Sequence, residues 1–158
     1  MAYSVRFASN SAEDIETLVR LRLEFSDANN GPHPESYELR KSCLKDYFER
    51  HINVDCFCPI VEVGQTAVAM GALMIYEKPA SLSFPNGLVG DVLSVWTEPE
   101  YRHKGYARLI MEMIILKARE QGLMSVGLAA TPMGRPLYES LGFEPKASEN
   151  VEMRLRLK

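Results

Sequence analysis

One turn of the sequence groups residue types that suit the binding of an anion. Residues 98–108 read EPEYRHKGYAR, and they lie between two apolar stretches. Arg102 and Lys104 supply positive charge, while Gly105 and Ala107 keep bulky side chains away from the backbone. If a helix begins at Gly105, its first backbone N–H groups lack partners and carry positive potential. Such a helix start is suited to a pyrophosphate.

The usual nucleotide-binding loops do not occur in the sequence. It contains neither G-x-x-x-x-G-K-S/T nor G-x-G-x-x-G, so it does not favour ATP or NAD as the ligand. His33, His51 and His103 are acid–base candidates, because imidazole titrates near neutral pH. We expect His103 to face a bound phosphate or solvent and His33 to lie in a loop.

The first half of the chain predicts one strand and two helices. Residues 5–8 are a strand candidate, and Ser11 to Asp14 resemble a capping box at a helix start. Turn-forming residues at 27–34 predict a loop. A second helix is expected from about Glu35 to Arg50. Apolar side chains at helical spacing define the inner faces: Ile15, Leu18, Val19 and Phe25 in the first helix, and Tyr37, Leu44, Tyr47 and Phe48 in the second.

The second half predicts a sheet that is crossed by a buried helix. Gly64 and Gln65 form the turn of a predicted hairpin. The helix is apolar on almost every side, which is typical of a buried helix. The expected segments are strands at 59–63, 66–76 and 88–97 with a loop at 78–87, a helix at 105–121, a strand at 125–130, a short helix at 135–141 and a closing strand at 151–157.

This order, β-α-α-β-β-β-α-β-α-β, predicts an α+β fold with a mixed sheet. Consecutive strands favour antiparallel pairing, whereas the helix at 105–121 must cross over between two parallel strands. The length of 158 residues suits one domain over residues 1–158.

The overall composition is that of an ordinary globular protein. A net charge of −3 and a pI of about 5.7 do not favour a nucleic-acid partner. The first residues lack the pattern of a signal peptide, and no apolar run approaches the roughly 20 residues of a membrane helix. We therefore expect a cytoplasmic protein without a membrane partner. Cys56 and Cys58 have neither zinc spacing nor further ligands nearby, so they are interpreted as strand residues and no metal is expected.

Two motifs resemble signatures of the GCN5-related N-acetyltransferase (GNAT) family. Val95-Trp96-Thr97 followed by EPEYRHKGYA is similar to the acetyl-CoA motif, an apolar strand and then V-x-P-E-Y-R-x-x-G-x-G/A. GRPLYESLGF at 134–143 is similar to the second signature, A-x-x-L-Y-x-x-x-G-F. The predicted order of elements matches that of the family over essentially the whole chain. The resemblance implies a three-layer fold with a mostly antiparallel sheet, whose two parallel strands splay apart at an acetyl-CoA cleft.

The resemblance also implies which residues bind acetyl-CoA. The pyrophosphate is expected on the turn formed by Arg102, His103, Lys104, Gly105, Tyr106 and Ala107. The pantetheine arm is expected along Val95, Trp96 and Thr97, bonded to the backbone of Val95 and Thr97 beside a bulge that opens the cleft. Thr131 lies where many members have an asparagine that contacts the cofactor, and the threonine hydroxyl can still form a hydrogen bond.

The catalytic roles follow from the family and from the chemistry of thioester aminolysis. Tyr138 matches the tyrosine that protonates the leaving thiolate, and a backbone N–H near Val95 is expected to stabilise the carbonyl oxygen. Some members of the family carry a glutamate base on the strand at 125–130, and here that position holds Val126. Other members carry a glutamate earlier on the cofactor strand, and that position matches Asp91. A chain of waters is the alternative base. Strand alternation predicts that Asp91, Leu93, Val95 and Thr97 share one face.

The predicted function is acetyl-CoA-dependent N-acetylation of a primary amine, on a small molecule or on an exposed peptide or protein amine. The alternative is an acyl-CoA sensor of the same fold with little turnover. A tRNA-acetylating toxin is disfavoured, because the chain has no basic run. The acceptor site is expected near 27–34, the start of the second helix and 78–87, where Asp27, Glu35 and Glu38 indicate either a cationic acceptor or a solvated acidic surface. A homodimer is common in the family, and the sequence leaves the oligomeric state open.

Overall fold

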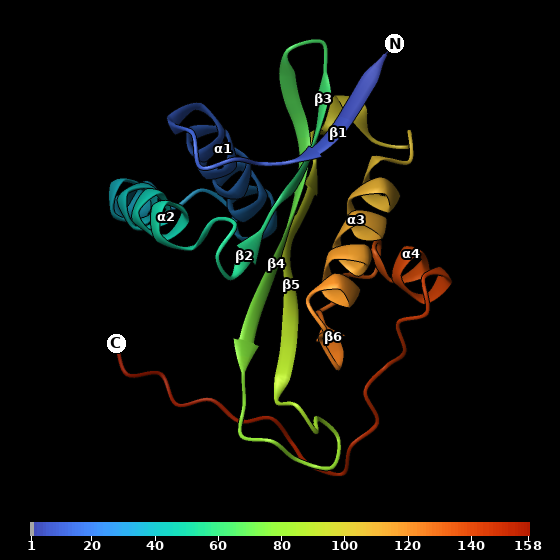
Figure 1. Ribbon diagram of the computed structural model, residues 1–158. Helices are drawn as coiled ribbons and strands as arrows, with labels where there is room; N and C mark the ends of the chain where they lie inside the picture. Colours follow the sequence, from blue (N-terminus) through green and yellow to red (C-terminus); the bar gives the residue numbers. More distant parts are fainter. Residues whose placement is uncertain (1) are drawn as a thin grey trace. The chain divides into compact units, whose positions relative to one another are not determined.

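The computed structural model describes residues 2–158. The chain divides into two compact units, which meet between Leu128 and Ala129 in the sequence. In the first unit a sheet lies between two layers of helices, with α1 and α2 on one face and α3 on the other (Figure 1). The second unit contains the short helix α4 (Arg135–Ser140).

The elements follow the predicted order over most of the chain. The first unit contains β1 (Tyr3–Phe7), α1 (Ala12–Asn30), the short 3-10 helix η1 (Pro34–Ser36), α2 (Tyr37–His51), β2 (Cys56–Phe57), β3 (Pro59–Val63), β4 (Thr66–Glu77), β5 (Leu88–Thr97), η2 (Pro99–Tyr101), α3 (Tyr106–Glu120) and β6 (Ser125–Gly127). Among residues 2–158, no helix is both long and apolar enough to cross a membrane.

The sheet has the mixed pairing that the sequence predicts. Its order is β1-β3-β4-β5-β6, with β2 also paired to β4. The pairs are antiparallel apart from β5 and β6, which are parallel and are connected through α3. The predicted α+β fold with a mixed sheet is therefore confirmed.

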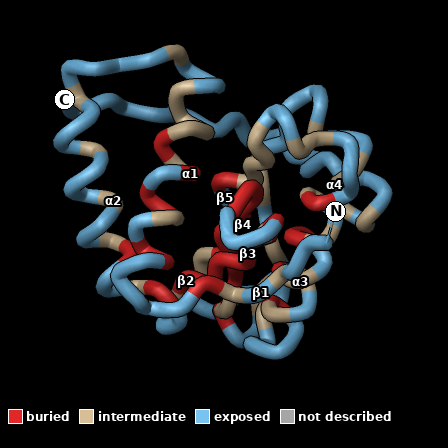
Figure 2. Tube along the Cα trace, turned by 90° about the horizontal axis from the view of Figure 1, so that it is seen from above, coloured by how far each residue is buried: buried red, intermediate tan, exposed pale blue. Residues whose placement is uncertain are grey.

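The core lies on both faces of the sheet. Figure 2 shows buried residues on the central strands and on the inner side of α1, while α2 is mostly exposed. On the α1–α2 face, Leu18 and Leu21 are fully buried. On the other face, α3 packs closely over Gly71 of β4, where an added Cβ would lie only 2.5 Å from Cγ2 of Ile110. A glycine at this position therefore lets the helix approach the sheet.

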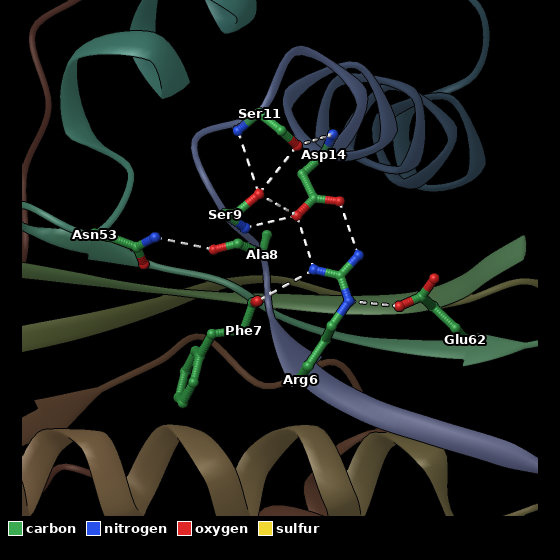
Figure 3. Close-up of polar contacts among 8 residues, drawn as sticks. All are labelled: Arg6, Phe7, Ala8, Ser9, Ser11, Asp14, Asn53 and Glu62. Carbon is green, nitrogen blue, oxygen red and sulfur yellow. Dashed lines mark hydrogen bonds and ion pairs between the residues drawn. The ribbon is translucent and has the colours of Figure 1, made fainter. Parts of the chain in front are cut away.

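A charged network fixes α1 to the sheet (Figure 3). The Ser11 hydroxyl caps α1 by accepting a hydrogen bond from the Asp14 N–H at 3.1 Å, as the capping pattern predicts. The Asp14 carboxylate accepts two bonds from Arg6 of β1, at 2.8 and 2.9 Å, and another from the Ser9 N–H at 2.6 Å. Arg6 also pairs with Glu62 of β3 at 2.6 Å. The start of α1 is thus bonded to the sheet edge.

The predicted loop at 27–34 begins later than expected, because α1 continues to Asn30. The side-chain amides of Asn29 and Asn30 donate to the carbonyls of Phe25 and Ser26, one helical turn back. The helix ends at Gly31, whose φ of +76° is accessible to glycine. Local side-chain bonds thus extend a helix through residues that also favour turns.

The predicted closing strand at 151–157 is wrong. No helix or strand is assigned from Leu141 onward, and Val151, Met153, Leu155 and Leu157 are more than 80% exposed. An alternating pattern forms a strand only when a partner supplies backbone hydrogen bonds. The second unit contains no strand within its described residues. The strand predicted at 125–130 is likewise shorter, since β6 ends at Gly127.

Candidate active site

A bulge interrupts β5 at the position where the family resemblance predicts one. Met70 of β4 pairs with Trp96, and Ala72 pairs with Leu93, so Ser94 and Val95 together oppose the single residue Gly71. Ser94 has a φ of +58°, in the left-handed region that is costly for serine. Two residues opposite one is the signature of a β-bulge, which bends the strand and redirects its backbone.

The prediction that Asp91, Leu93, Val95 and Thr97 share one face is wrong, because the bulge interrupts the alternation along β5. Asp91 and Leu93 pair with Met74 and Ala72, which lie on the α1–α2 face of the sheet. Val95 is instead on the α3 face, where its Cγ2 lies 3.7 Å from a Cβ built on Gly71. Asp91 and Leu93 thus do not share a face with Val95 and Thr97, because the extra residue shifts the alternation by one position.

The parallel pairing of β5 with β6 ends before the bulge. β5 and β6 are paired only from Val89 to Asp91, opposite Ser125 to Gly127. The remaining part of β5, through Thr97, has no parallel partner among the described residues. The end of this pairing before the bulge is compatible with the expected splaying of the parallel strands, which stays a prediction.

The turn before α3 has the backbone geometry of an anion site. His103 and Gly105 both have positive φ, of +64° and +83°. Gly105 is the N-cap of α3, and the first helical hydrogen bond runs from the Leu109 N–H to its carbonyl at 3.2 Å. The N–H groups of Tyr106 and Ala107 precede that bond, at the open start of the helix. A Cβ at Gly105 would have no atom within 4 Å, so the space above this backbone is empty of protein.

Arg102 anchors the turn to the sheet. Its Nε donates to the Thr97 carbonyl at 3.0 Å, and its guanidinium lies 4.9 Å from the centre of the Trp96 ring. The Trp96 indole N–H in turn donates to Glu24 of α1 at 3.3 Å. These contacts indicate that Arg102 and Trp96 hold the turn in place, in addition to the charge that Arg102 brings.

The other residues of the turn divide into exposed and buried side chains. His103 and Lys104 are exposed, and Ala107 is partly buried. The side chain of Tyr106 is buried against the ring of Tyr3, with 5.4 Å between the ring centres. Tyr106 can therefore offer a ligand only its backbone, whereas the His103 and Lys104 side chains are free to reach one.

Asp91 lies on the α1–α2 face of the sheet, on the same side as the Ser94 hydroxyl. Burial, followed by the charge and hydrogen bond of the Asp91 carboxylate, raises the pKa of the Tyr76 hydroxyl on β4. Asp91 precedes the bulge by three residues, or about 10 Å along a strand. That separation suits action through water rather than direct contact with a group at the bulge.

Tyr138 and Thr131 belong to the second unit. Burial raises the pKa of the Tyr138 hydroxyl, and its ring packs edge-on against Phe143 with 6.0 Å between centres. The Thr131 hydroxyl accepts a hydrogen bond from the Gly134 N–H at 3.1 Å, just before α4. Thr131 thus has a structural role at the start of α4.

The remaining candidates gather into no further site. His33 contacts Glu35 at 3.2 Å, and His51 contacts Asp55 at 2.7 Å. Cys56 and Cys58 are buried, with their sulfur atoms 3.7 Å apart. Within residues 2–158, no three side chains of histidine, cysteine, aspartate or glutamate form a group that could hold a metal ion.

Arg22 is a residue that sequence reasoning missed. It extends from α1 to the bulge, where its Nη1 donates to the Ser94 hydroxyl at 2.8 Å. Arg22 lies four residues after Leu18 and three before Phe25, within the apolar stripe of the predicted helix. A charged residue in an apolar stripe is the signal that could have identified it. Ser94 gave no such signal, because the bulge depends on pairing with β4.

Comparison with known proteins agrees with this geometry. Residues 18–143 match the model of the acetyltransferase (GNAT) family. Similar solved structures include a predicted acetyltransferase with acetyl-CoA from Clostridium acetobutylicum, with a TM-score of 0.83 and 24% identity over 97% of this chain and 96% of that one. Another is a GCN5-related N-acetyltransferase from Ralstonia eutropha JMP134, with a TM-score of 0.80 and 23% identity over 96% and 99% of the two chains.

A third similar structure is named for its acceptor. It is glucosamine-6-phosphate N-acetyltransferase from Arabidopsis thaliana, with a TM-score of 0.68 and 16% identity over 100% of both chains. No curated protein sequence matches this chain. Identities below 25% show a common fold, while the family match covers most of the chain. The chain therefore belongs to the GCN5-related N-acetyltransferase (GNAT) family.

Proposed function

We propose that the chain, acting as one domain, transfers the acetyl group of acetyl-CoA to a primary amine of a small molecule or of a peptide or protein. The observation that carries this proposal is the bulge at Ser94 and Val95, located beyond the last residue that pairs β5 with β6. It supplies backbone groups outside the regular ladder, beyond the end of the parallel pairing. When an amine attacks the thioester carbonyl carbon, the carbonyl oxygen gains negative charge. A backbone N–H already directed at that oxygen stabilises the charge.

The turn before α3 fits the pyrophosphate of acetyl-CoA. Gly105 leaves open space above the backbone, and the helix start directs N–H groups toward it. Lys104 and His103 are exposed beside this turn, whereas Arg102 is bonded to Thr97. We assign the backbone of Gly105, Tyr106 and Ala107 to phosphate binding.

We assign the pantetheine arm to the backbone of Val95. The Thr97 carbonyl already accepts the Arg102 bond, so Val95 is the better candidate for hydrogen bonding to an added strand. Trp96 positions this segment through its contacts with Arg102 and Glu24. We keep Thr131 as a further candidate contact, supported by its sequence position only.

The proton transfers are assigned from sequence and chemistry. Bound acetyl-CoA supplies an activated thioester, and the chain must remove a proton from the amine and give one to sulfur. Tyr138 is the proposed acid because it matches the tyrosine of the second motif; burial raises the pKa of its hydroxyl, which keeps it protonated until the thiolate forms. Asp91, acting through water, is the proposed base, and a water chain alone is the alternative.

A melting experiment tests cofactor binding. A ligand at a hundredfold excess over its Kd stabilises the native state by about 2.7 kcal/mol, which corresponds to roughly 5–10 °C for a chain of this size. We expect this shift with acetyl-CoA and CoA and a smaller one with ATP. If neither CoA species shifted the melting temperature, the assignment of the turn would be wrong.

Release of free CoA thiol with a panel of amines then separates an enzyme from a sensor. An enzyme releases thiol in proportion to the amine that is added. A sensor binds acetyl-CoA with the same melting shift and releases no thiol above the rate without amine. The latter result would replace the proposed transfer with acyl-CoA sensing.

A further inference from the structure

A cavity between α1 and α2 concentrates positive charge. It has a volume of about 440 Å³, and its lining includes Arg22, Ser26, Arg40, Cys43, Tyr47 and Arg50. Three of its lining side chains are cationic, and neither aspartate nor glutamate lines it. Both helices belong to the first unit, and they lie side by side on one face of the sheet (Figure 1).

Arg22 is the cation whose environment most strongly indicates a ligand. It is partly buried, and within residues 2–158 the Ser94 hydroxyl is the one hydrogen-bond acceptor of its guanidinium. No carboxylate of the described chain lies within 4 Å of it, although the Phe25 ring lies 5.2 Å from its central carbon. Burial lowers the pKa of Arg22, while an arginine stays charged at neutral pH. Buried charges are normally paired, so the partly buried guanidinium of Arg22 is suited to pair with an anion that binds from outside the chain.

The other two arginines have only weak counter-charges. Arg40 Nη1 lies 3.8 Å from Asp27 Oδ1, beyond hydrogen-bond distance, and its other contacts are with the Ser26 and Ser36 hydroxyls and the His33 carbonyl. Arg50 pairs with Asp46 at 3.3 Å, in a solvent-exposed pair that contributes little. The cavity therefore keeps a net positive charge.

The acidic residues that indicated a cationic acceptor are absent from this lining. Glu35 is exposed in η1 and contacts His33, and Glu38 is exposed at the start of α2. Asp27 lines a separate cavity beside α1, together with Glu13 and Glu16. The basic cavity is linked to the bulge by the bond from Arg22 to Ser94.

We propose that this cavity binds an anionic group, a carboxylate or a phosphate, on the amine that is acetylated. Arg22 is then a specificity-determining residue, which bonds the anion on one side and Ser94 on the other. The amine of such an acceptor would extend from the cavity toward the bulge. The link to acetylation rests on the proposed function, whereas anion binding by the cavity does not.

Titration calorimetry with three small probes tests the proposal. The probes are O-phosphoethanolamine, β-alanine and ethanolamine, which carry a phosphate, a carboxylate and no anion. Saturating CoA is included so that the turn before α3 does not bind the anions. We expect at least one anionic probe to bind about tenfold or more tightly than ethanolamine, and the tighter of the two identifies the anion. Equal binding of all three, or binding of none, would overturn the proposal.

Two pairs of variants locate the binding. Arg22→Met should weaken binding of the anionic probe by about ten- to a hundredfold, the range for a hydrogen bond to a charged group, while Arg22→Lys should retain part of it. Cys43 is exposed on α2, so Cys43→Asp adds a negative charge to the lining without disturbing the core. Cys43→Asn has nearly the same shape, and the ratio between these two variants isolates the charge.

A third substitution controls for net charge. Arg119 lies on α3, across the sheet from the cavity, and Arg119→Met should leave anion binding unchanged. If the Cys43→Asp and Cys43→Asn affinities were equal, the anion would have to bind elsewhere. If CoA itself failed to shift the melting temperature, the proposed function would fail, and the same variants titrated without CoA would still decide the anion site.

Discussion

Replacing Gly105 by alanine tests whether phosphate binds at the start of α3. A methyl group at this position would occupy space that is empty of protein within 4 Å. The same substitution at Gly122, just beyond the other end of α3, meets equally open space. The two glycines also share a left-handed backbone, with φ of +83° and +72°. They therefore form a matched pair, of which only Gly105 lies at the predicted cofactor site.

The expected loss of stability is similar for both variants. A residue with a Cβ in the left-handed region costs about 1–2 kcal/mol, and neither methyl group adds a steric clash with the protein. For a chain of this length, that cost lowers the melting temperature by roughly 2–8 °C. The effects on CoA should differ, because only the Gly105→Ala methyl group separates the phosphate from the backbone N–H groups. Loss of one charge-assisted hydrogen bond weakens binding by about tenfold or more.

Two measurements on each variant decide the matter. Thermal melts without ligand give the strain, and titration calorimetry with CoA gives the affinity. We expect nearly equal melting temperatures, wild-type CoA affinity in Gly122→Ala and weakened affinity in Gly105→Ala. Equal CoA affinity in the two variants would place the pyrophosphate elsewhere and refute the reasoning from the turn.

Three further substitutions test catalysis and stability. Tyr138→Phe should slow single-turnover acetyl transfer by up to ~10²–10⁴-fold with little change in acetyl-CoA affinity, and a wild-type rate would leave water as the proton source. Asp91→Asn should lower the transfer rate at neutral pH and change its pH profile if Asp91 is the base, whereas an unchanged profile favours the water chain. Asp14→Asn should destabilise the fold by about 1–3 kcal/mol, because the buried Asp14 carboxylate loses its charge-assisted hydrogen bonds with Arg6 and Ser9, while Arg6 keeps its pair with Glu62. Because the hydrogen bonds from Arg6 hold the pKa of Asp14 well below its usual range, the stability from this pair is present above about pH 4 and is lost at lower pH. The denaturation midpoint of the variant should therefore change less with pH, between about pH 2 and 5, than the midpoint of the wild type.

Local patterns predicted most of the first unit. The Gly64-Gln65 turn, the full extent of β5 and the Ser11 cap all depend on residues that are close in sequence. The helix at 105–121 was equally clear, since it is apolar over most of its surface and is bounded by two glycines. Each of these features carries its own signal in a short window, so no knowledge of the sheet was needed.

The errors came from features that depend on distant partners. The segment 151–157 alternates like a strand, yet alternation does not supply a neighbouring strand to pair with. Val95 was assigned to the face of Asp91 because the bulge opposite Gly71 cannot be seen in the sequence of β5 alone. The positions of Tyr138 and Arg102 in the motifs were evident from the resemblance, but the contact of Arg102 with Trp96 required the fold. Arg22 was overlooked because its partner, Ser94, is 72 residues away.

The bulge has a consequence for what a single deletion in β5 would do. Without Ser94, Val95 would oppose Gly71 directly, and Leu93 and Trp96 would keep their present partners, Ala72 and Met70. Every other side chain of β5 would stay on its own face, so a continuous ladder would form and the left-handed residue would be gone. Arg22 would lose its hydrogen-bond acceptor, and the backbone beside Val95 would turn back into regular pairing. A regular sheet and the proposed acetyl-transfer site thus differ by one inserted residue, and we expect the shorter protein to keep the fold with a more regular sheet and to lose transfer activity.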